Sequence, residues 1–132
     1  MTSKADVREA FARCQAEASV AFGCADLYVE EFLPQARHIE IQIIGDALGS
    51  IIGLGERECS VQRRNQKVIE IAPCPNLSQS LRQDITASAI RLAKAQGYFS
   101  LGTFEFLVDM SSADPRFVFI EANARLQVEH TV

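Results

Sequence analysis

Polar and apolar residues alternate most clearly over residues 37–44. In a β-strand successive side chains point to opposite faces, so this alternation predicts a half-buried strand. The apolar positions are Ile39, Ile41 and Ile43, and the polar ones are His38, Glu40 and Gln42. Residues 45–49 contain two glycines and an aspartate, which predict a turn into a return strand over residues 50–61.

Two other segments repeat apolar residues at the three- and four-residue spacing of a helix. The first begins at a cap on Ser3 and ends near Gly23, and the second begins at Ser78 or Ser80 and ends at Gly97. The expected apolar positions are Val7, Ala10, Phe11, Cys14 and Ala18 in the first helix and Leu81, Ile85, Ala89, Leu92 and Ala93 in the second.

The remaining apolar runs predict strands over residues 27–32, 67–72, 101–109 and from 116 onward, with a polar loop over 62–66. Helices and strands in this order, joined by short connections, predict an α+β fold with a mostly antiparallel sheet and flanking helices. The sequence stops directly after a strand-like segment. We therefore expect residues 1–132 to be one partial domain, truncated at both ends.

Composition narrows the function. The formal net charge of −4 argues against a nucleic-acid backbone as the main partner, because phosphate binding depends on Lys and Arg. No apolar run is long enough to span a bilayer, so we expect no membrane partner and a cytoplasmic location, with the mitochondrial matrix as the alternative. The four cysteines lack the spacing of a zinc site and are expected to be buried free thiols: Cys14, Cys24, Cys59 and Cys74.

The strongest chemical pattern lies in residues 120–129. One extended strand would place five polar side chains on one face: Glu121, Asn123, Arg125, Gln127 and Glu129. If the preceding loop folds symmetrically about Ala113, Glu105 lies opposite Glu121. Directly opposed acids destabilise a sheet unless a divalent cation lies between them. A magnesium site and an ordinary solvated face both remain open on this pattern alone.

Two further patterns are weaker. Residues 62–67 place Arg63, Arg64 and Lys67 around two amides, which suits a phosphate or bicarbonate site as well as a solvated hairpin tip. His38 is a lone histidine on a strand, which is more often structural. No glycine-rich phosphate loop and no Ser-His-Asp arrangement is present in the sequence.

Five segments in order resemble biotin carboxylase, an ATP-grasp enzyme found as a domain of pyruvate carboxylases and acyl-CoA carboxylases. They are residues 37–42, 55–64, 66–70, 102–106 and 121–130. The resemblance implies a reaction in which ATP and bicarbonate form carboxyphosphate, which then carboxylates biotin on a carrier domain. It implies ATP, Mg²⁺ or Mn²⁺, and biotin as cofactors and substrate. The implied partners are the rest of the biotin carboxylase domain, the carrier, a carboxyltransferase and a second copy in a homo-oligomer.

The resemblance also assigns roles to individual residues. An adenosine-binding edge is implied for Glu30, Glu31, Phe32, Leu33 and His38, with Gln62 and Asn65 as further nucleotide contacts. A metal set is implied for Glu105, Glu121 and Asn123. A bicarbonate and biotin site is implied for Lys67, Arg125 and the backbone of Val128, with Glu129 as the base that deprotonates bicarbonate.

One departure is visible: the family usually has His where this chain has Asn65, which can hydrogen-bond but cannot become charged. Two alternatives remain at this stage. One is another ATP-grasp ligase, such as a carbamoyl-phosphate synthetase, and the other is a non-catalytic binding module with the same fold. Because the phosphate-covering lid of such enzymes is absent from the sequence, we expect the isolated chain to be inactive.

Overall fold

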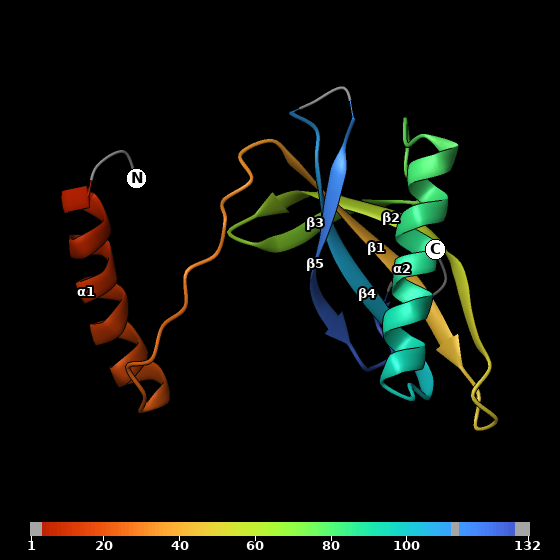
Figure 1. Cartoon of the computed structure of the whole chain (residues 1–132), viewed down its shortest axis with the longest axis horizontal. Helices are drawn as coiled ribbons and strands as arrows, with labels where there is room; N and C mark the ends of the chain where they lie inside the picture. The colour runs from red at the N-terminus through yellow and green to blue at the C-terminus, as the bar shows by residue number, and fades with distance from the viewer. Residues whose placement is uncertain (1–3, 112–113, 129–132) are drawn as a thin grey trace. The chain divides into compact units, whose positions relative to one another are not determined.

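The computed structural model describes residues 4–111 and 114–128. Contacts divide the chain into two compact units, one up to Phe32 and one from Leu33 onward. The first unit contains α1 (Lys4–Phe22), which confirms the first predicted helix and its end before Gly23 (Figure 1). The predicted cap, Ser3, lies outside the described residues. Among the residues described, no helix is both long and apolar enough to cross a membrane.

The second unit is a five-stranded sheet with one helix, in the strand order β3-β2-β1-β4-β5 (Figure 1). Its elements are β1 (Ala36–Gly45), β2 (Ile51–Arg63), β3 (Gln66–Ile71), α2 (Gln79–Ala95), β4 (Ser100–Asp109) and β5 (Arg116–Asn123). All four pairings between these strands are antiparallel. The predicted α+β class is therefore confirmed.

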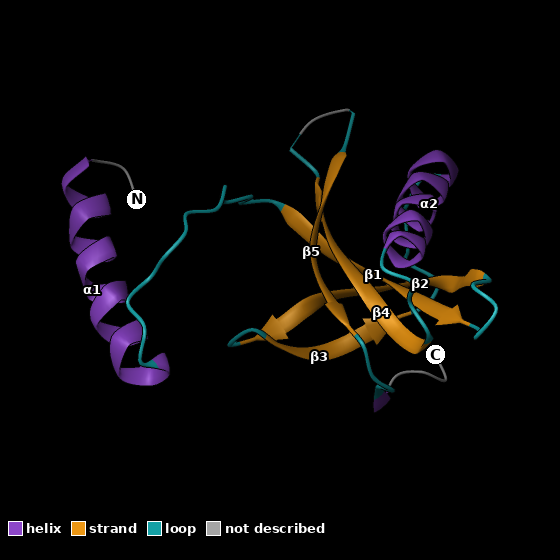
Figure 2. Ribbon diagram, turned by 60° about the horizontal axis from the view of Figure 1, so that its bottom comes forward, coloured by secondary structure: helices purple, strands orange, loops and turns teal. Residues whose placement is uncertain are grey.

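Helix α2 covers one face of the sheet (Figure 2). Its inward stripe packs on the isoleucines of β1 and on apolar side chains of β4, and this cluster forms the core of the second unit. The stripe consists of Leu81, Ile85, Ala89 and Ala93, as predicted, whereas Leu92 is 36% exposed. Burial of each large aliphatic side chain contributes about 1.5–3 kcal/mol, so this face supplies most of the driving force for folding.

Both ends of α2 follow the predicted capping. Ser78 Oγ accepts a hydrogen bond from the backbone N–H of Leu81 at 3.3 Å, which satisfies a free donor of the first turn. Gly97 has φ +58°, and the N–H of Tyr98 donates to the carbonyl of Ala93 at 2.9 Å. This is a Schellman ending, in which glycine takes the left-handed position at no steric cost.

Three sequence predictions about local structure are wrong. Residues 27–32 form no strand, because no described strand pairs with them and side chains such as Val29 are exposed. The loop at 62–66 is a two-residue turn at Arg64 and Asn65, both with positive φ, so the strands extend further than expected. Two of the four cysteines, Cys14 and Cys24, are exposed.

The prediction that β1 is half-buried is also wrong, because both of its faces are covered. Glu40 is fully buried and Gln42 is 6% exposed, although they lie on the face opposite α2. Figure 2 shows why: the sheet is strongly curved, and the β2–β3 hairpin bends across this polar face. Lys67 of β3 therefore contacts Glu105 of β4, although two strands separate β3 from β4 in the sheet.

The core under α2 gives a first testable prediction. Ile85→Ala removes a fully buried side chain from the centre of the helix–sheet interface and leaves a cavity. We expect the free energy of unfolding to fall by about 2–5 kcal/mol, measured by urea denaturation. Leu92→Ala on the same helix is the matched control and should cost much less; equal losses would contradict the packing described.

Candidate functional site

Four charged residues lie in one row across the polar face of the sheet. Arg57 of β2 pairs with Glu40 of β1, Glu40 pairs with Glu105 of β4, and Glu105 pairs with Glu121 of β5. Paired residues in an antiparallel sheet point to the same face, so one cation and three acids stand side by side. The predicted opposition of Glu105 and Glu121 is confirmed.

Two local irregularities create this row. Between Ile41 and Ile43 the β1–β2 register shifts by one residue near Gly55, whose φ of +122° suits only glycine. Without the shift, Glu56 would lie opposite Glu40 in place of Arg57. A second shift in β5 skips Ile120, which would otherwise oppose Glu105. The pairing of Glu105 with Glu121 therefore does not follow from the loop alone: it also needs the bulge at Ile120.

Glu40 is held between two cations. Its Oε1 accepts from Arg57 Nε at 2.5 Å, and its Oε2 accepts from Lys67 Nζ at 2.5 Å. Both Glu40 and Arg57 are buried, at 0% and 2% exposure, so the pair is shielded from solvent. Hydrogen bonds from neighbouring side chains must therefore replace the hydration of both charges. Burial opposes the charge of Lys67, but Glu40 and Glu105 outweigh it and raise the pKa of Lys67 above its usual value. Lys67 is therefore a protonated ammonium at neutral pH.

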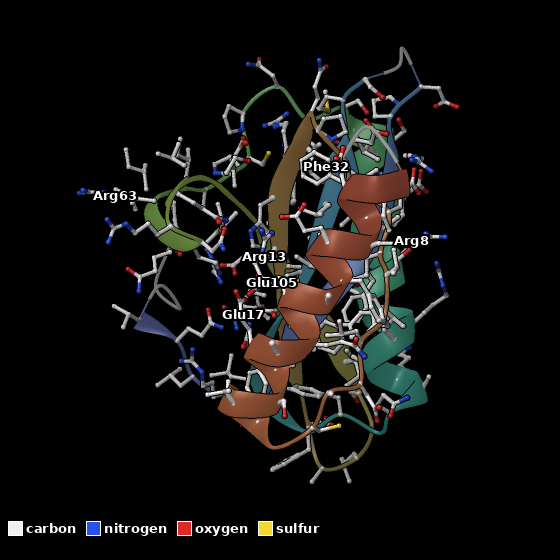
Figure 3. All side chains as sticks on the ribbon, turned by 90° about the vertical axis from the view of Figure 1, so that its left-hand side faces the viewer. Arg8, Arg13, Glu17, Phe32, Arg63 and Glu105 are labelled. Carbon is white, nitrogen blue, oxygen red and sulfur yellow. The ribbon has the colours of Figure 1, made fainter. Side chains whose placement is uncertain are left out.

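Glu105 is the second buried acid of the row, and three side chains surround it. His38 Nε2 lies 2.5 Å from Oε2, while Asn123 Nδ2 and Lys67 Nζ lie 2.7 and 3.3 Å from Oε1. Burial alone would raise the pKa of Glu105, but the His38 hydrogen bond and the charge of Lys67 hold it below its usual value. Figure 3 shows Glu105 near the middle of the sheet, whereas the exposed Arg63 lies on the β2–β3 hairpin.

The hydrogen bonds fix the tautomer of His38. Gln62 Nε2 lies 2.7 Å from His38 Nδ1 and can only donate, so Nδ1 accepts and Nε2 carries the proton toward Glu105. The same Gln62 nitrogen donates to the carbonyl of Cys59 at 2.8 Å. Thus two predicted nucleotide contacts, His38 and Gln62, touch each other, and His38 also contacts the predicted metal ligand Glu105.

The predicted metal set converges on one atom. Asn123 Nδ2 lies 2.7 Å from Glu105 Oε1 and 3.1 Å from Glu121 Oε1, so the two carboxylates approach a common point. Carboxylate and amide oxygens are the ligands that Mg²⁺ prefers. The two carboxylates therefore fit a small divalent cation, with Glu121 at the exposed end and Glu105 at the buried end. Asn123 would join them only through its amide oxygen, because the nitrogen that faces both acids is a hydrogen-bond donor and cannot bind a cation.

A second group of acidic and thiol atoms fits a metal less well. Ligand atoms of Glu40, Cys59 and Glu70 lie within 4.8 Å of one another. Both oxygens of Glu40 already accept from Arg57 and Lys67. In addition, burial and the charge of Glu40 raise the pKa of Cys59, which favours the neutral thiol over the thiolate that a metal requires.

An open pocket of about 380 Å³ lies beside the row. It is lined by Gln66, Lys67, Glu70, Glu105, Glu121, Asn123, Arg125 and Gln127. Of these, Lys67, Arg125, Gln127 and the three predicted metal ligands were singled out from the sequence. The sequence analysis did not single out Glu40, Arg57 or Glu70. Glu40 could have been found, because it lies two residues from His38 and therefore on the same strand face.

The prediction of one extended strand through residue 129 is wrong. β5 ends at Asn123, and the chain then turns, so Arg125 reaches the pocket from an irregular segment. Gln127 Nε2 donates to Thr103 Oγ1 at 3.1 Å and ties this segment to β4. Val128 is 93% exposed, and Glu129 lies outside the described residues.

The predicted nucleotide contacts belong to different units of the chain. His38 and Gln62 lie at the site in the second unit, whereas Glu30, Glu31 and Phe32 belong to the first unit, and their side chains are exposed. Leu33 opens the second unit and is partly buried. Asn65 occupies the exposed turn between β2 and β3, where its φ of +61° is one that asparagine tolerates better than most residues.

The lowered pKa of Glu105 gives a prediction about acid stability. A carboxyl whose pKa is lower in the folded state stabilises the fold above its unfolded pKa of about 4.3, and this is lost as the pH falls through the folded pKa. We expect wild type to lose more unfolding free energy than Glu105→Gln between about pH 6 and about pH 3. Asp84→Asn, on an exposed position of α2, is the control and should follow wild type. Parallel curves for wild type and Glu105→Gln would contradict the ion-pair description.

Comparison with known proteins places this site in a family. The model of the "carbamoyl-phosphate synthase L chain, ATP binding domain" family matches residues 1–132. Pyruvate carboxylase 1 of Caenorhabditis elegans is 55% identical over 127 residues, which are 96% of this chain and 11% of that protein. The chain thus spans about a tenth of the length of this curated relative.

Two solved structures share the fold. The biotin carboxylase–βγ-ATP complex from Campylobacter jejuni has a TM-score of 0.88 and 46% identity, covering 98% of this chain and 28% of that one. The biotin carboxylase domain of 2-oxoglutarate carboxylase from Hydrogenobacter thermophilus, in complex with MgADP, ADP and bicarbonate, has a TM-score of 0.82 and 44% identity. It covers 94% of this chain and 27% of that one. The chain is therefore an ATP-grasp fragment like those of biotin carboxylases, and it belongs to the family of the carbamoyl-phosphate synthase L chain ATP-binding domain.

Proposed function

We propose that this chain is the metal- and bicarbonate-binding part of a biotin carboxylase, which uses ATP and bicarbonate to carboxylate biotin on a carrier domain. The observation that carries the proposal is the single pocket that joins Lys67 and Arg125 to the acids Glu105 and Glu121 and to Asn123. Such a pocket offers cations for an anionic substrate beside oxygen ligands for a metal. The similarity to a biotin carboxylase–ATP complex and to a bicarbonate complex supports the same assignment.

Lys67 is proposed to hold the bicarbonate anion together with Arg125 and the backbone of Val128. Its raised pKa keeps the ammonium charged, and its side chain retains 22% exposure while its Nζ contacts Glu40. A charged donor at the pocket wall can make the charge-assisted hydrogen bond that a small oxyanion needs. We further propose that Arg125 stabilises the enolate form of biotin.

Glu105, Glu121 and Asn123 are proposed to hold Mg²⁺ or Mn²⁺, which when bound would neutralise the phosphate charge of ATP. Asn123 Nδ2 donates to both acids, which holds their carboxylates close together.

Glu129 is proposed as the base that takes the proton from bicarbonate, so that an oxygen of the deprotonated bicarbonate can attack the γ-phosphorus of ATP, which forms carboxyphosphate and releases ADP. The C–O bond of carboxyphosphate then breaks to give carbon dioxide and phosphate. The ureido nitrogen of biotin adds to the carbon dioxide, and the released phosphate takes the proton from that nitrogen.

The nucleotide contacts are likewise a proposal. Glu30, Glu31, Phe32 and Leu33 are proposed for the adenosine edge, with His38, Gln62 and Asn65 as further contacts. We propose that residues 1–132 are one partial domain, inactive alone, which works with the rest of the carboxylase domain, the carrier and a carboxyltransferase in a homo-oligomer. The carboxyl acceptor stays open, because the relatives include both a pyruvate and a 2-oxoglutarate carboxylase. The location stays a prediction: cytoplasm, or alternatively the mitochondrial matrix.

The family name favours one second candidate, a carbamoyl-phosphate synthase. The full-length protein distinguishes the two in one assay. With ATP, Mg²⁺ and bicarbonate, a biotin carboxylase requires biotin and forms carboxybiotin, whereas a carbamoyl-phosphate synthase requires an ammonia donor and forms carbamoyl phosphate. Stimulation by ammonia without any biotin dependence would overturn the proposal.

The metal assignment predicts the effect of two substitutions. Glu105→Ala and Glu121→Ala each remove a carboxylate from the proposed cation site, so turnover in the full-length protein should fall below detection at millimolar Mg²⁺. The measurement is ATP-dependent biotin carboxylation across a Mg²⁺ titration. Asp84→Asn, exposed on α2, is the control and should keep the wild-type Mg²⁺ curve. Near-normal turnover in either alanine variant would rule out a shared cation.

The base assignment predicts a different kinetic result. Glu129→Gln keeps the size of the side chain but cannot accept the proton, so kcat should fall by about 10²–10⁴-fold. The affinity for ATP, measured by isothermal titration calorimetry, should stay close to wild type because the substitution leaves the phosphate contacts in place. A collapse of ATP binding would instead place Glu129 among the nucleotide or metal contacts.

A further inference from the structure

We propose that Arg57 is a positioning residue for the bicarbonate site: it holds Glu40 so that Lys67 presents its ammonium to the pocket. This inference rests on the proposed function of Lys67. Arg57 itself does not line the pocket. It is nonetheless the largest fully buried side chain among the described residues, on the polar side of the sheet, where apolar packing does not explain it.

The geometry forms a continuous chain from β4 to the pocket. Gln42 Nε2 donates to the carbonyl of Gly102 at 3.0 Å, and Gln42 Oε1 accepts from Arg57 Nη2 at 2.9 Å. Arg57 Nε donates to Glu40 Oε1, and Lys67 Nζ donates to Glu40 Oε2, each at 2.5 Å. Each link uses a different atom of the guanidinium, amide or carboxylate. The position of Lys67 is thereby tied to the backbone of β4.

Charge explains why this arrangement matters for an anion. Glu40 is fully buried, and a buried carboxylate requires compensation from its neighbours. If Lys67 were its only cation, the ammonium would be committed to Glu40, and an entering anion would compete with it. With Arg57 on the other oxygen, the carboxylate is already neutralised. Lys67 also contacts Glu105 at 3.3 Å, so its ammonium is shared between two acids, and the charge of Arg57 offsets part of the demand that these acids make on it.

Arginine suits this role better than lysine would. Its planar guanidinium contacts Glu40 through Nε and Gln42 through Nη2 at the same time, which fixes the orientation of the carboxylate. A lysine at this position keeps the charge but offers a single nitrogen. Arg57→Lys should therefore preserve neutralisation and lose orientation, whereas Arg57→Met, of similar length, loses both.

The test uses the full-length protein and compares the kinetics of two substrates. We expect Arg57→Met to lower kcat/KM for bicarbonate by about 10²-fold, since a displaced reactive group costs about this much. Arg57→Lys should give a smaller loss, of about 10-fold. The KM for ATP should remain within about twofold of wild type in both variants. Because charge is retained, Arg57→Lys carries the test if Arg57→Met does not fold.

A matched control separates positioning from general stability. Arg82 Nε lies 3.1 Å from Glu56, which neighbours Arg57 on the same strand, and neither residue of this ion pair lines the pocket. Arg82→Met should lower the melting temperature and leave the KM for bicarbonate unchanged. Equal bicarbonate kinetics in Arg57→Met, Arg82→Met and wild type would overturn the inference.

A double variant tests whether Arg57 acts through Glu40. Once Glu40→Gln has removed the carboxylate charge, adding Arg57→Met should lower kcat/KM for bicarbonate by less than threefold more. Fully additive losses would show that Arg57 does not work through Glu40 and would overturn the inference. Wild type in the same assay tests the proposed function itself. If wild type shows no bicarbonate-dependent turnover, both the proposed function and the Arg57 inference are overturned. If wild type turns over normally and the Arg57 variants are unaffected, only the Arg57 inference is overturned.

Discussion

Three acids in one row across a curved sheet are the constraint on which this site depends. Glu40, Glu105 and Glu121 are direct neighbours on β1, β4 and β5, and two of them are almost fully buried. Such a row is unfavourable unless cations and amides compensate it. Arg57 and Lys67 supply charge, and further hydrogen bonds complete the shell around each buried carboxylate. Lys67, Glu105 and Glu121 thus belong both to this charged network and to the wall of the pocket.

The row also shows how small backbone irregularities determine chemistry. A one-residue shift changes which side chains face the core. The bulge at Gly55 brings Arg57 to the polar face, and the bulge at Ile120 does the same for Glu121. Without them the row would contain an opposed pair of acids at one end and an isoleucine at the other. The same shift in β2 sets Glu56 opposite Ile41, and this buried acid pairs with Arg82 of α2.

Curvature then joins strands that are distant in the sheet. β3 and β4 are separated by β2 and β1, but Lys67 contacts Glu105 because the hairpin bends over the polar face. This closure buries the acids and leaves one open side, where Arg125 completes the pocket. A site built this way places cationic and acidic side chains around a single space, which suits the proposed binding of bicarbonate beside a metal-bound nucleotide.

The sequence by itself determined the features that depend on local chemistry. Periodicity and capping residues located both helices, alternation located β1, and the short separation of Glu105 from Glu121 made their opposition predictable. Motifs in order identified the family. Only the tertiary structure decided that Glu40 and Arg57 are buried, because alternation shows which side chains share a face but not what covers that face. It also decided that β5 ends at Asn123 and that residues 27–32 have no partner strand among those described. These outcomes rest on sheet curvature and strand pairing between distant residues, which no local pattern contains.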